Sequence, residues 1–166
     1  RVNAISGRGI VRNYGGMAAD TLPQAYPFVL FDRSVRDADS AWQPQVVVVA
    51  LGTTDFSTPL AAGERWQDRA ALRADYEAGY VAFVQSLRAR HPQARIVLWS
   101  TGLLDGEIRA EVERVLAPLR GHGETRTTSA PVDVLRMTGC HAHPSLDDHE
   151  RIAAALIAHI DALPAA

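Results

Sequence analysis

The feature of this sequence that most constrains its fold is the uninterrupted apolar run at residues 46–51, which reads Val-Val-Val-Val-Ala-Leu. A β-branched run of this length is typical of a strand that is buried on both faces, in the middle of a parallel sheet. The run ends at Gly52, and the polar residues Thr53, Thr54 and Asp55 follow at once. Because open α/β sheets bind ligands beyond the carboxyl ends of their strands, this loop is the first candidate for chemistry.

Strand and helix patterns alternate through the rest of the chain. Further strands of the same sheet are predicted at residues 2–5, 95–100 and 131–135. Helices with apolar residues every three or four positions are predicted at residues 68–90, 105–119 and 146–163, with a shorter helix within residues 21–31. The alternation predicts one α/β domain over residues 1–166, a three-layer α/β/α sandwich with a central parallel sheet of the flavodoxin-like type.

The apolar positions of the three long helices define the faces that we expect to be buried. The predicted inner faces are Leu72, Tyr76, Tyr80, Phe83, Val84 and Leu87; Ile108, Val112, Val115, Leu116 and Leu119; and Ile152, Ala153, Leu156, Ile157 and Ile160. His91 and Pro92 end the first of these helices. Ser145 is a predicted N-cap of the last one, whose first turn carries Asp147 and Asp148.

The composition excludes several classes of function. The net charge is -2 and no basic run with interleaved aromatic residues is present, so the sequence gives no sign of nucleic-acid binding. No apolar run approaches the ~20 residues that a membrane span requires. Cys140 is the single cysteine, so no internal disulfide can form. A targeting segment, if the gene encodes one, would lie ahead of Arg1.

Two more loops carry residues suited to chemistry. The first is the polar stretch after the predicted strand at residues 2–5, which contains Gly7, Gly9, Gly15 and Gly16. Glycines in such a loop let backbone amides approach a ligand. A dinucleotide-binding fingerprint would need a further glycine where Arg12 stands, which argues against a nucleotide site.

The second loop runs from Cys140 to Pro144, ahead of the last predicted helix. A histidine at the carboxyl edge of a sheet suits a general base, and His143 has that position. Amide or hydroxyl donors from the other two loops could then form an oxyanion hole.

These three loops resemble sequence blocks of the SGNH hydrolases. The segment Leu-Gly-Thr-Thr-Asp-Phe-Ser at residues 51–57 resembles their third block, usually Gly-x-Asn-Asp, and His-Pro-Ser at residues 143–145 resembles the fifth. Ile-Ser-Gly-Arg-Gly-Ile-Val-Arg-Asn-Tyr at residues 5–14 resembles the second. The wording of the second block, with Trp-Gln-Pro at residues 42–44 and Gly-Cys at residues 139–140, is most similar to the acetylxylan esterases of carbohydrate esterase family 2.

The resemblance implies a serine esterase that removes O-acetyl groups from carbohydrate, such as acetylxylan or an acetylated oligosaccharide. It makes His143 the catalytic base and places Gly7 and Gly9 at the oxyanion. Thr54 stands where the family carries its oxyanion asparagine, with Asp55 beside it. The same resemblance implies an acetylated carbohydrate as partner and a secreted or periplasmic location. With the composition and the residue spacing, we expect no metal, no cofactor, and no nucleic-acid or membrane partner.

The sequence also departs from the family pattern. The family's nucleophile lies in a Gly-Asp-Ser motif after the first strand, and no serine here has that context. We therefore expect the first strand of the fold and the nucleophile to come from an N-terminal segment or chain outside these residues, and the chain alone to be inactive. Relatives often carry an acid near the histidine, where this chain has Cys140, His141 and Ala142. Some relatives manage without one, because a backbone carbonyl orients the imidazole.

Other interpretations of the same residues stay open. The alternative from another class is a catalytically silent carbohydrate-binding module with an SGNH fold. A second alternative gives Asp55 the purely structural role of building a turn and capping a helix. A third makes His143 an ordinary surface histidine. Cys140, His141, His143 and His149 could suggest a metal cluster, but their spacing is not that of a standard zinc site.

Overall fold

The computed structural model describes residues 1–29, 33–133 and 135–164. Along the chain its elements are η1 (Tyr14–Gly16), α1 (Leu22–Ala25), β1 (Val46–Val49), α2 (Thr53–Phe56), α3 (Arg69–Arg90), β2 (Arg95–Thr101), α4 (Glu107–Gly121), β3 (Thr127–Val132), η2 (Cys140–Ala142) and α5 (Leu146–Asp161). None of the described helices combines the length and the apolar character that crossing a bilayer would require.

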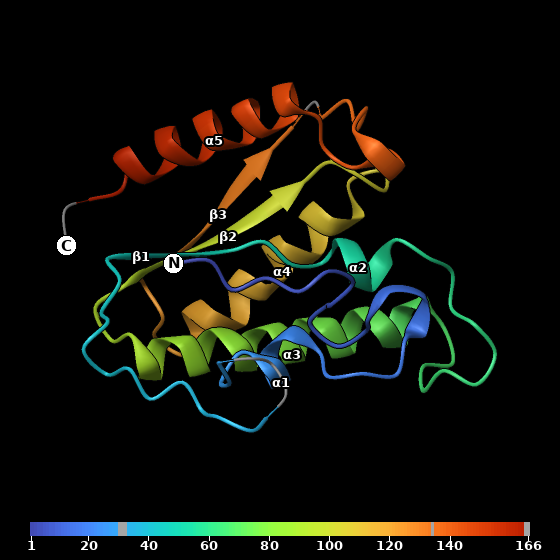
Figure 1. The fold of residues 1–166 in the computed structure, drawn as a ribbon, viewed down its shortest axis with the longest axis horizontal. Coiled ribbons are helices and arrows are strands. Elements are labelled where there is room, and N and C mark those ends of the chain that lie inside the picture. Colours follow the sequence, from blue (N-terminus) through green and yellow to red (C-terminus); the bar gives the residue numbers. More distant parts are fainter. Residues whose placement is uncertain (30–32, 134, 165–166) are drawn as a thin grey trace.

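The described strands form a parallel sheet in the order β1-β2-β3, covered by helices on both sides (Figure 1). Two neighbouring residues of β3 show the layers. The hydroxyl of Thr128 lies 2.9 Å from Nε2 of His159 on α5. The hydroxyl of Ser129 donates to Glu113 on α4. Because successive side chains of a strand point to opposite faces, α4 and α5 cover opposite faces of the sheet, which confirms the predicted α/β/α sandwich.

Helices α3 and α4 form the main core with the inner side of the sheet. All the apolar residues predicted for their inner faces are buried. The side chain of Asp68 caps α3 by accepting a hydrogen bond from the amide of Ala71 at 2.8 Å, and the helix ends at His91, as predicted. Burial of these side chains supplies the main stabilising free energy and fixes the sheet against the two helices.

The prediction that residues 46–51 form a central strand, buried on both faces, is wrong. Among the described residues β1 pairs with β2 alone, so β1 is an edge strand and β2 is the central one. Val48 is 40% exposed, whereas Ile96, Val97 and Leu98 of β2 are fully buried. The cause is the surroundings: β2 has a strand on each side and α4 against it, whereas β1 lacks a neighbour on its outer side within the described chain.

Three other expectations need correction. Residues 2–5 are irregular and do not join the described sheet, because no described strand lies next to them. The last strand was predicted at residues 131–135, but β3 spans Thr127–Val132, and Val134 lies outside the described residues. On α5, Ala153 and Ile157 are exposed and the other three predicted inner residues are half-buried, because the helix packs mainly against β3.

The shorter predicted helix is α1, which begins after Thr21. Thr21 and Gln24 form a capping box, and Pro23 occupies the first turn, where its missing amide proton is not needed. Leu30 and Phe31, at the end of the predicted range, lie outside the described residues.

Candidate active site

The three loops that the sequence singled out lie toward one edge of the sheet. Residues 50–52 lead from β1 into α2, and the stretch after β3 leads through η2 into α5. All the described strands are parallel, so their carboxyl ends share this edge (Figure 1). The glycine-rich loop at residues 7–16 is held against α2 by hydrogen bonds to Asp55.

Gly52 makes the sharp turn from β1 into α2. Its φ is 125°, a conformation that L side chains rarely adopt, and an added Cβ would lie 2.6 Å from the hydroxyl oxygen of Tyr76. That hydroxyl donates to the carbonyl of Leu51 at 3.2 Å. A glycine is therefore required for the strand to end here and for α2 to start against the core.

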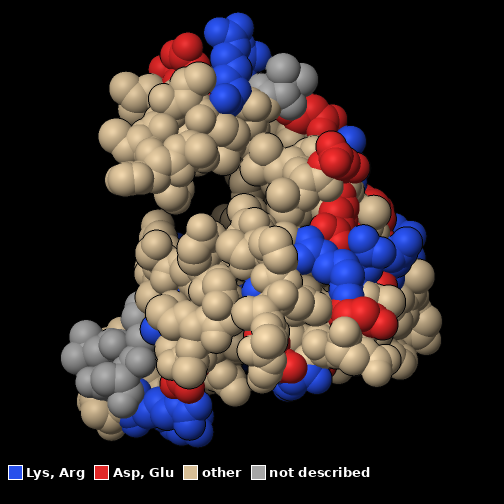
Figure 2. Space-filling model, turned by 90° about the vertical axis from the view of Figure 1, so that its right-hand side faces the viewer, with Lys and Arg blue, Asp and Glu red and all other residues tan. Residues whose placement is uncertain are grey.

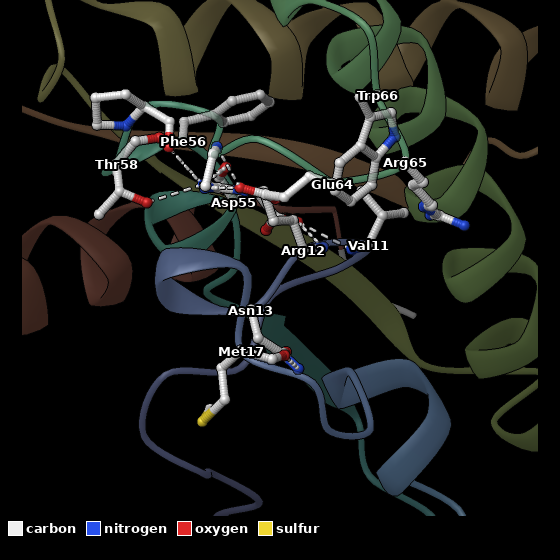
Figure 3. A network of polar contacts seen from close by, with 12 residues as sticks. Val11, Arg12, Asn13, Met17, Asp55, Phe56, Thr58, Glu64, Arg65 and Trp66 are labelled. Carbon is white, nitrogen blue, oxygen red and sulfur yellow. Dashed lines mark hydrogen bonds and ion pairs between the residues drawn. The ribbon is translucent and has the colours of Figure 1, made fainter.

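Asp55 joins α2 to the glycine-rich loop. Its side chain is fully buried, and its carboxylate accepts hydrogen bonds from the backbone amides of Ile10, Val11 and Arg12, each at 2.9 Å (Figure 3). Burial raises the pKa of Asp55 to about 6, although the three amide donors act in the opposite direction. The carboxylate points inward, so the structure gives Asp55 a role in positioning the loop.

The absence of a side chain at Gly9 allows the glycine-rich loop to approach Asp55 closely. A Cβ at this position would lie 2.5 Å from Oδ2 of Asp55 and 2.2 Å from the carbonyl oxygen of Arg12. The amide of Gly9 donates to Oδ1 of Asn13 over a long 3.3 Å, and the amide of Asn13's side chain binds the carbonyls of Met17 and Ala19. Buried Asn13 therefore closes the loop on itself from within.

Arg12 fixes the far side of the same loop. Its guanidinium is buried and forms a forked ion pair with Glu64, with Nε–Oε2 at 2.6 Å and Nη2–Oε1 at 2.8 Å (Figure 3). It also donates to the carbonyls of Thr58 and Pro59. The hydrogen bond from Arg12 lowers the pKa of Glu64 to about 2. Arg12 is therefore a scaffold of the loop, and its partner could not be identified from the sequence because Glu64 lies far along the chain.

Thr54 lines a cavity of about 810 Å³ that extends along β1. Ile5 and Arg8 line the cavity too, so the glycine-rich loop and α2 share one space at this end of the strand. Gly7, with φ 74°, turns the loop just before Arg8, and its carbonyl accepts from the amide of Tyr14 at 2.9 Å. The predicted oxyanion residues thus lie on two segments that Asp55 holds together.

His143 lies on the loop between β3 and α5, and its side chain is exposed. Its Nδ1 is 3.0 Å from the carbonyl oxygen of Cys140. A carbonyl can only accept, so this contact requires the proton on Nδ1 and leaves Nε2 of the neutral ring free to accept one. The carbonyl thus orients the imidazole.

The backbone around His143 is held in an unusual shape. His141 and Ala142 have φ of 54° and 55°, and Gly139 could not carry a side chain, because a Cβ would lie 2.7 Å from the carbonyl oxygen of Pro144. The amide of Gly139 donates to the carbonyl of His143 at 2.9 Å. These contacts shape the turn that presents the Cys140 carbonyl to the imidazole.

Asp148 closes the loop that carries His143. It is fully buried in the first turn of α5, and its carboxylate accepts from the amides of Arg136, Met137 and Ser145 at 2.8–3.0 Å and from the hydroxyl of Ser145 at 2.9 Å. The amide of Arg136 is the main cause that lowers the pKa of Asp148 to about 2. Sequence reasoning identified Ser145 as a cap, which is confirmed, but missed the link to residues 136–137.

The face that carries these loops is hollowed. Figure 2 shows a deep opening between the upper part of the molecule, where α5 lies, and the lower part. Among the residues that the structure describes, no group of three or more His, Cys, Asp or Glu side chains is placed to hold a metal ion. The arrangement offers a histidine whose tautomer a carbonyl contact defines, a hydroxyl at the cavity and a glycine-rich loop held by a buried carboxylate.

Comparison with known proteins gives no match to a protein-family model but clear relatives. An acetylxylan esterase/glucomannan deacetylase from Cellvibrio japonicus (strain Ueda107) is 42% identical over 161 residues, which cover 96% of this chain and 45% of that protein. The cellulase/esterase CelE of Acetivibrio thermocellus is 31% identical over 166 residues, covering 95% of this chain and 19% of CelE. The chain thus spans about half the length, or less, of these curated relatives.

Solved structures agree with these relatives. A carbohydrate esterase whose active site is described as displaying divergent catalytic and non-catalytic binding functions matches with a TM-score of 0.91 and 40% identity, over 95% of this chain and 51% of that one. A family two carbohydrate esterase from Clostridium thermocellum, in complex with cellohexaose, matches with a TM-score of 0.79 and 28% identity, over 93% of this chain and 47% of that one.

Proposed function

Because this chain is related to the SGNH-type carbohydrate esterases of family 2 over about half of their length, we propose that it supplies the base and the oxyanion-binding loops of a carbohydrate O-deacetylase. The proposed substrates are acetylxylan and related acetylated oligosaccharides, in line with the names of the relatives. Acetylxylan is found outside the cell, so the proposal includes a secreted or periplasmic location.

The observation that carries the proposal is the contact between Nδ1 of His143 and the carbonyl of Cys140. It fixes the tautomer in which Nε2 accepts a proton, which is the state that a general base requires. Asp148 and Gly139 hold the loop in the shape that makes this contact possible.

In the proposed reaction, a serine from outside residues 1–166 attacks the acetyl carbonyl while Nε2 of His143 takes the hydroxyl proton. The new Oγ–C bond forms, the bond between the acetyl carbon and the sugar oxygen breaks, and the proton passes from Nε2 to that oxygen. Water then attacks the acetyl-enzyme, with His143 as base again, and releases acetate. The chain's own contribution is to hold and move the proton at Nε2.

The oxyanion of each tetrahedral intermediate needs donors at about 3 Å. Thr54 offers a hydroxyl from the wall of the cavity. Gly7 and Gly9 would add backbone amides, that of Gly9 by giving up its long hydrogen bond to Asn13. Asp55 contributes indirectly, because it fixes that loop against α2. Convergence of these groups with His143 at one acetyl ester is part of the proposal.

The proposal is tested by measuring how fast the longest natural protein that contains this chain deacetylates an acetylated xylan. His143→Ala should lower the rate by roughly 10⁶-fold, the cost of losing the base in a serine hydrolase. His149→Ala, an exposed histidine on α5, is the matched control and should leave the rate unchanged. Full turnover in His143→Ala would refute the mechanism.

The purified 166-residue chain should not hydrolyse an aryl acetate. If this chain does hydrolyse it, and the activity survives His143→Ala, the site is wrong.

A second candidate function is binding without catalysis. The solved relative with non-catalytic binding functions and the one that holds cellohexaose support it, as does Thr54 in the place of the family's asparagine. This alternative predicts that acetylated oligosaccharide binds in a calorimetric titration while no variant turns it over.

A further inference from the structure

We propose that Arg69 and Tyr76 of α3 are positioning residues for Thr54: they fix the two ends of α2 and, through them, the place of the Thr54 hydroxyl on the wall of the cavity. This role rests on the proposed function, in which that hydroxyl binds the oxyanion. Both residues lie outside the loops at residues 5–14, 51–57 and 143–145 that the sequence singled out.

Helix α2 is a single turn and has little stability of its own. The amide of Phe56 donates to the carbonyl of Gly52 over a long 3.3 Å, and the amide of Ser57 donates to the carbonyl of Thr53 at 2.9 Å. One helical turn costs more conformational freedom than so few hydrogen bonds recover. The place of Thr54 within this turn therefore depends on contacts from other parts of the chain.

Tyr76 fixes the start of α2. Its side chain is fully buried, and its hydroxyl donates to the carbonyl of Leu51 at 3.2 Å, directly ahead of the turn at Gly52. Its ring lies edge-on to the ring of Phe56, with 4.8 Å between the ring centroids. One side chain of α3 thus contacts both the residue that leads into α2 and the last residue of α2.

Arg69 fixes the end of α2. Its Nη2 donates to the carbonyl of Phe56 at 2.6 Å, and its Nη1 donates to the carbonyl of Thr58 over a long 3.4 Å. The guanidinium carbon also lies 5.0 Å from the centroid of the Phe56 ring. The last carbonyls of a helix have no partner within the helix, and an arginine is a favourable donor for them.

Arg69 is itself held by α4. Arg69 and Glu107 are the first residues of α3 and α4, and they form a forked ion pair with Nε–Oε1 at 3.0 Å and Nη2–Oε2 at 2.6 Å. Figure 1 shows α2 beside the ends at which these two helices begin. The dipole of a helix disfavours a cation in its first turn. The carbonyls of α2 and the carboxylate of Glu107 therefore account for an arginine at this position.

The two contacts lie on either side of Thr54, between Leu51 and Phe56. Neither Arg69 nor Tyr76 lines the cavity, whereas Thr54 does, so both act on the cavity through α2. An oxyanion donor is effective at about 3 Å, and a displacement of about 1 Å can cost on the order of 100-fold in rate. Small losses of order in α2 should therefore appear in catalysis.

The first test compares two tyrosines in the longest natural protein that contains this chain, with an acetylated xylo-oligosaccharide as substrate. Tyr76→Phe keeps the ring but removes the hydroxyl, and should lower kcat roughly tenfold with KM within about twofold. Tyr80→Phe is the matched control, because Tyr80 is also fully buried and its hydroxyl donates to the carbonyl of Val49 at 3.4 Å, within β1. Its kcat should be unchanged, although the thermal midpoints of both variants should fall alike. Equal losses of kcat in the two variants would overturn the proposal.

The second test compares two arginines of α3. Arg69→Met removes the contacts with α2 and should lower kcat roughly tenfold, while Arg69→Lys keeps one donor and should restore part of the rate. Arg73→Met is the matched control, because Arg73 pairs with Glu107 as well but directs its remaining ion pair to Glu111. If Arg73→Met lowers kcat as much as Arg69→Met, the contact with α2 is not responsible and the proposal is wrong.

A double-mutant cycle tests whether Tyr76 acts through Thr54. Thr54→Val removes the hydroxyl while keeping the shape of the side chain. In that background Tyr76→Phe should have no further effect on kcat, because the group that it positions is already absent. Losses that multiply would show that Tyr76 acts by another route, and would overturn the proposal.

Hydrogen exchange measured by mass spectrometry on the same protein provides a test without catalysis. Exchange in the segment that contains Ser57 should accelerate roughly tenfold in Arg69→Met and in Tyr76→Phe, and stay unaltered in the two control variants. Unchanged exchange in both test variants overturns the proposal whatever the activity. If the unmodified protein has no turnover, the proposed function fails, and the exchange alone decides whether α3 positions α2.

Discussion

Asp55 and Asp148 are both fully buried, and the carboxylate of each accepts hydrogen bonds from three backbone amides. Their pKa values nevertheless move in opposite directions, to about 6 for Asp55 and to about 2 for Asp148. Asp55 lies against the aromatic core, where the loss of water outweighs its donors. Asp148 has an additional hydroxyl donor, and its hydrogen bonds, that from the amide of Arg136 first, outweigh the loss of water. The balance between loss of water and hydrogen bonding therefore sets the direction of each pKa shift.

The largest effect should follow from removing the deeper carboxylate. Asp55→Ala leaves three buried amides without an acceptor, and at roughly 1–3 kcal/mol for each unsatisfied group we expect a loss of about 4 kcal/mol in unfolding free energy. Denaturant unfolding measures it. Gly9→Ala should have a similar effect through its clash with Asp55, whereas Gly121→Ala, with open space around it, should be neutral or slightly stabilising. Equal stability of the Gly9 and Gly121 variants would contradict the role of Asp55.

The next effect is the pH dependence of stability. The folded pKa of Asp55, about 6, lies above its ordinary value of 3.8, so the native state binds the extra proton between these values. The contribution of Asp55 is therefore complete below about pH 4 and is lost as the pH rises through 6, by on the order of 3 kcal/mol. Asp148 acts in a lower window: its contribution is present above its ordinary pKa of 3.8 and is lost as the pH falls through about 2.

Unfolding free energies between about pH 4 and 7 separate the two windows. Asp55→Asn cannot titrate, so its stability should lack the fall that the unmodified chain shows between about pH 4 and 6. Asp148→Asn should retain that fall. If all three proteins change in parallel over this range, Asp55 is not the titrating group.

A smaller and more local effect is expected at the second aspartate. Asp148→Asn replaces one acceptor oxygen by a donor, so an amide of residues 136–137 or of Ser145 loses its partner. Exchange of the amide protons of Arg136 and Met137 should accelerate roughly tenfold, while the amides of α3 keep their protection. Asp147→Asn changes an exposed neighbour in the same turn and should leave the exchange unaltered. Faster exchange throughout the chain would mean that Asp148 supports the whole fold.

The smallest effect concerns the residue beside Asp55. Thr54→Asn should raise the rate of the longer protein on acetylated sugars by about tenfold, because a side-chain amide is a better placed oxyanion donor than a hydroxyl that fills the role in part. Steady-state rates for the two proteins measure it. An unchanged rate would remove Thr54 from the site while leaving the position of Asp55 intact.

The sequence predicted the helices better than the strands. Apolar residues at helical spacing identified α3 and α4 with all their buried apolar positions, because both helices bury one face against neighbours within the chain, although the burial of Glu111 on α4 was not predicted. The valine run identified β1 but not its exposure, since a strand is buried only by the elements placed beside it. For β3 the polar start Thr-Thr-Ser concealed a strand that α4 and α5 cover on both sides.

At the site, short-range sequence patterns identified the loops but not the long-range hydrogen bonds and ion pairs that hold these loops in place. Ser145 was recognisable as a cap because its partner is three residues away. The ion pair between Arg12 and Glu64 and the link from Asp148 to residues 136–137 join positions with no shared pattern. Both depend on which side chains become buried together, and burial cannot be read from one sequence.

The open edge of β1 also bears on how the isolated chain behaves in concentrated solution. Natural sheets protect such edges with charges, prolines or a covering segment, and residues 46–51 contain neither charge nor proline. Low charge and high β-propensity in a short exposed segment are the properties that template fibrillar growth. A segment that pairs along β1 would therefore protect the chain from aggregation, and we expect the chain to aggregate more readily when that edge is left open.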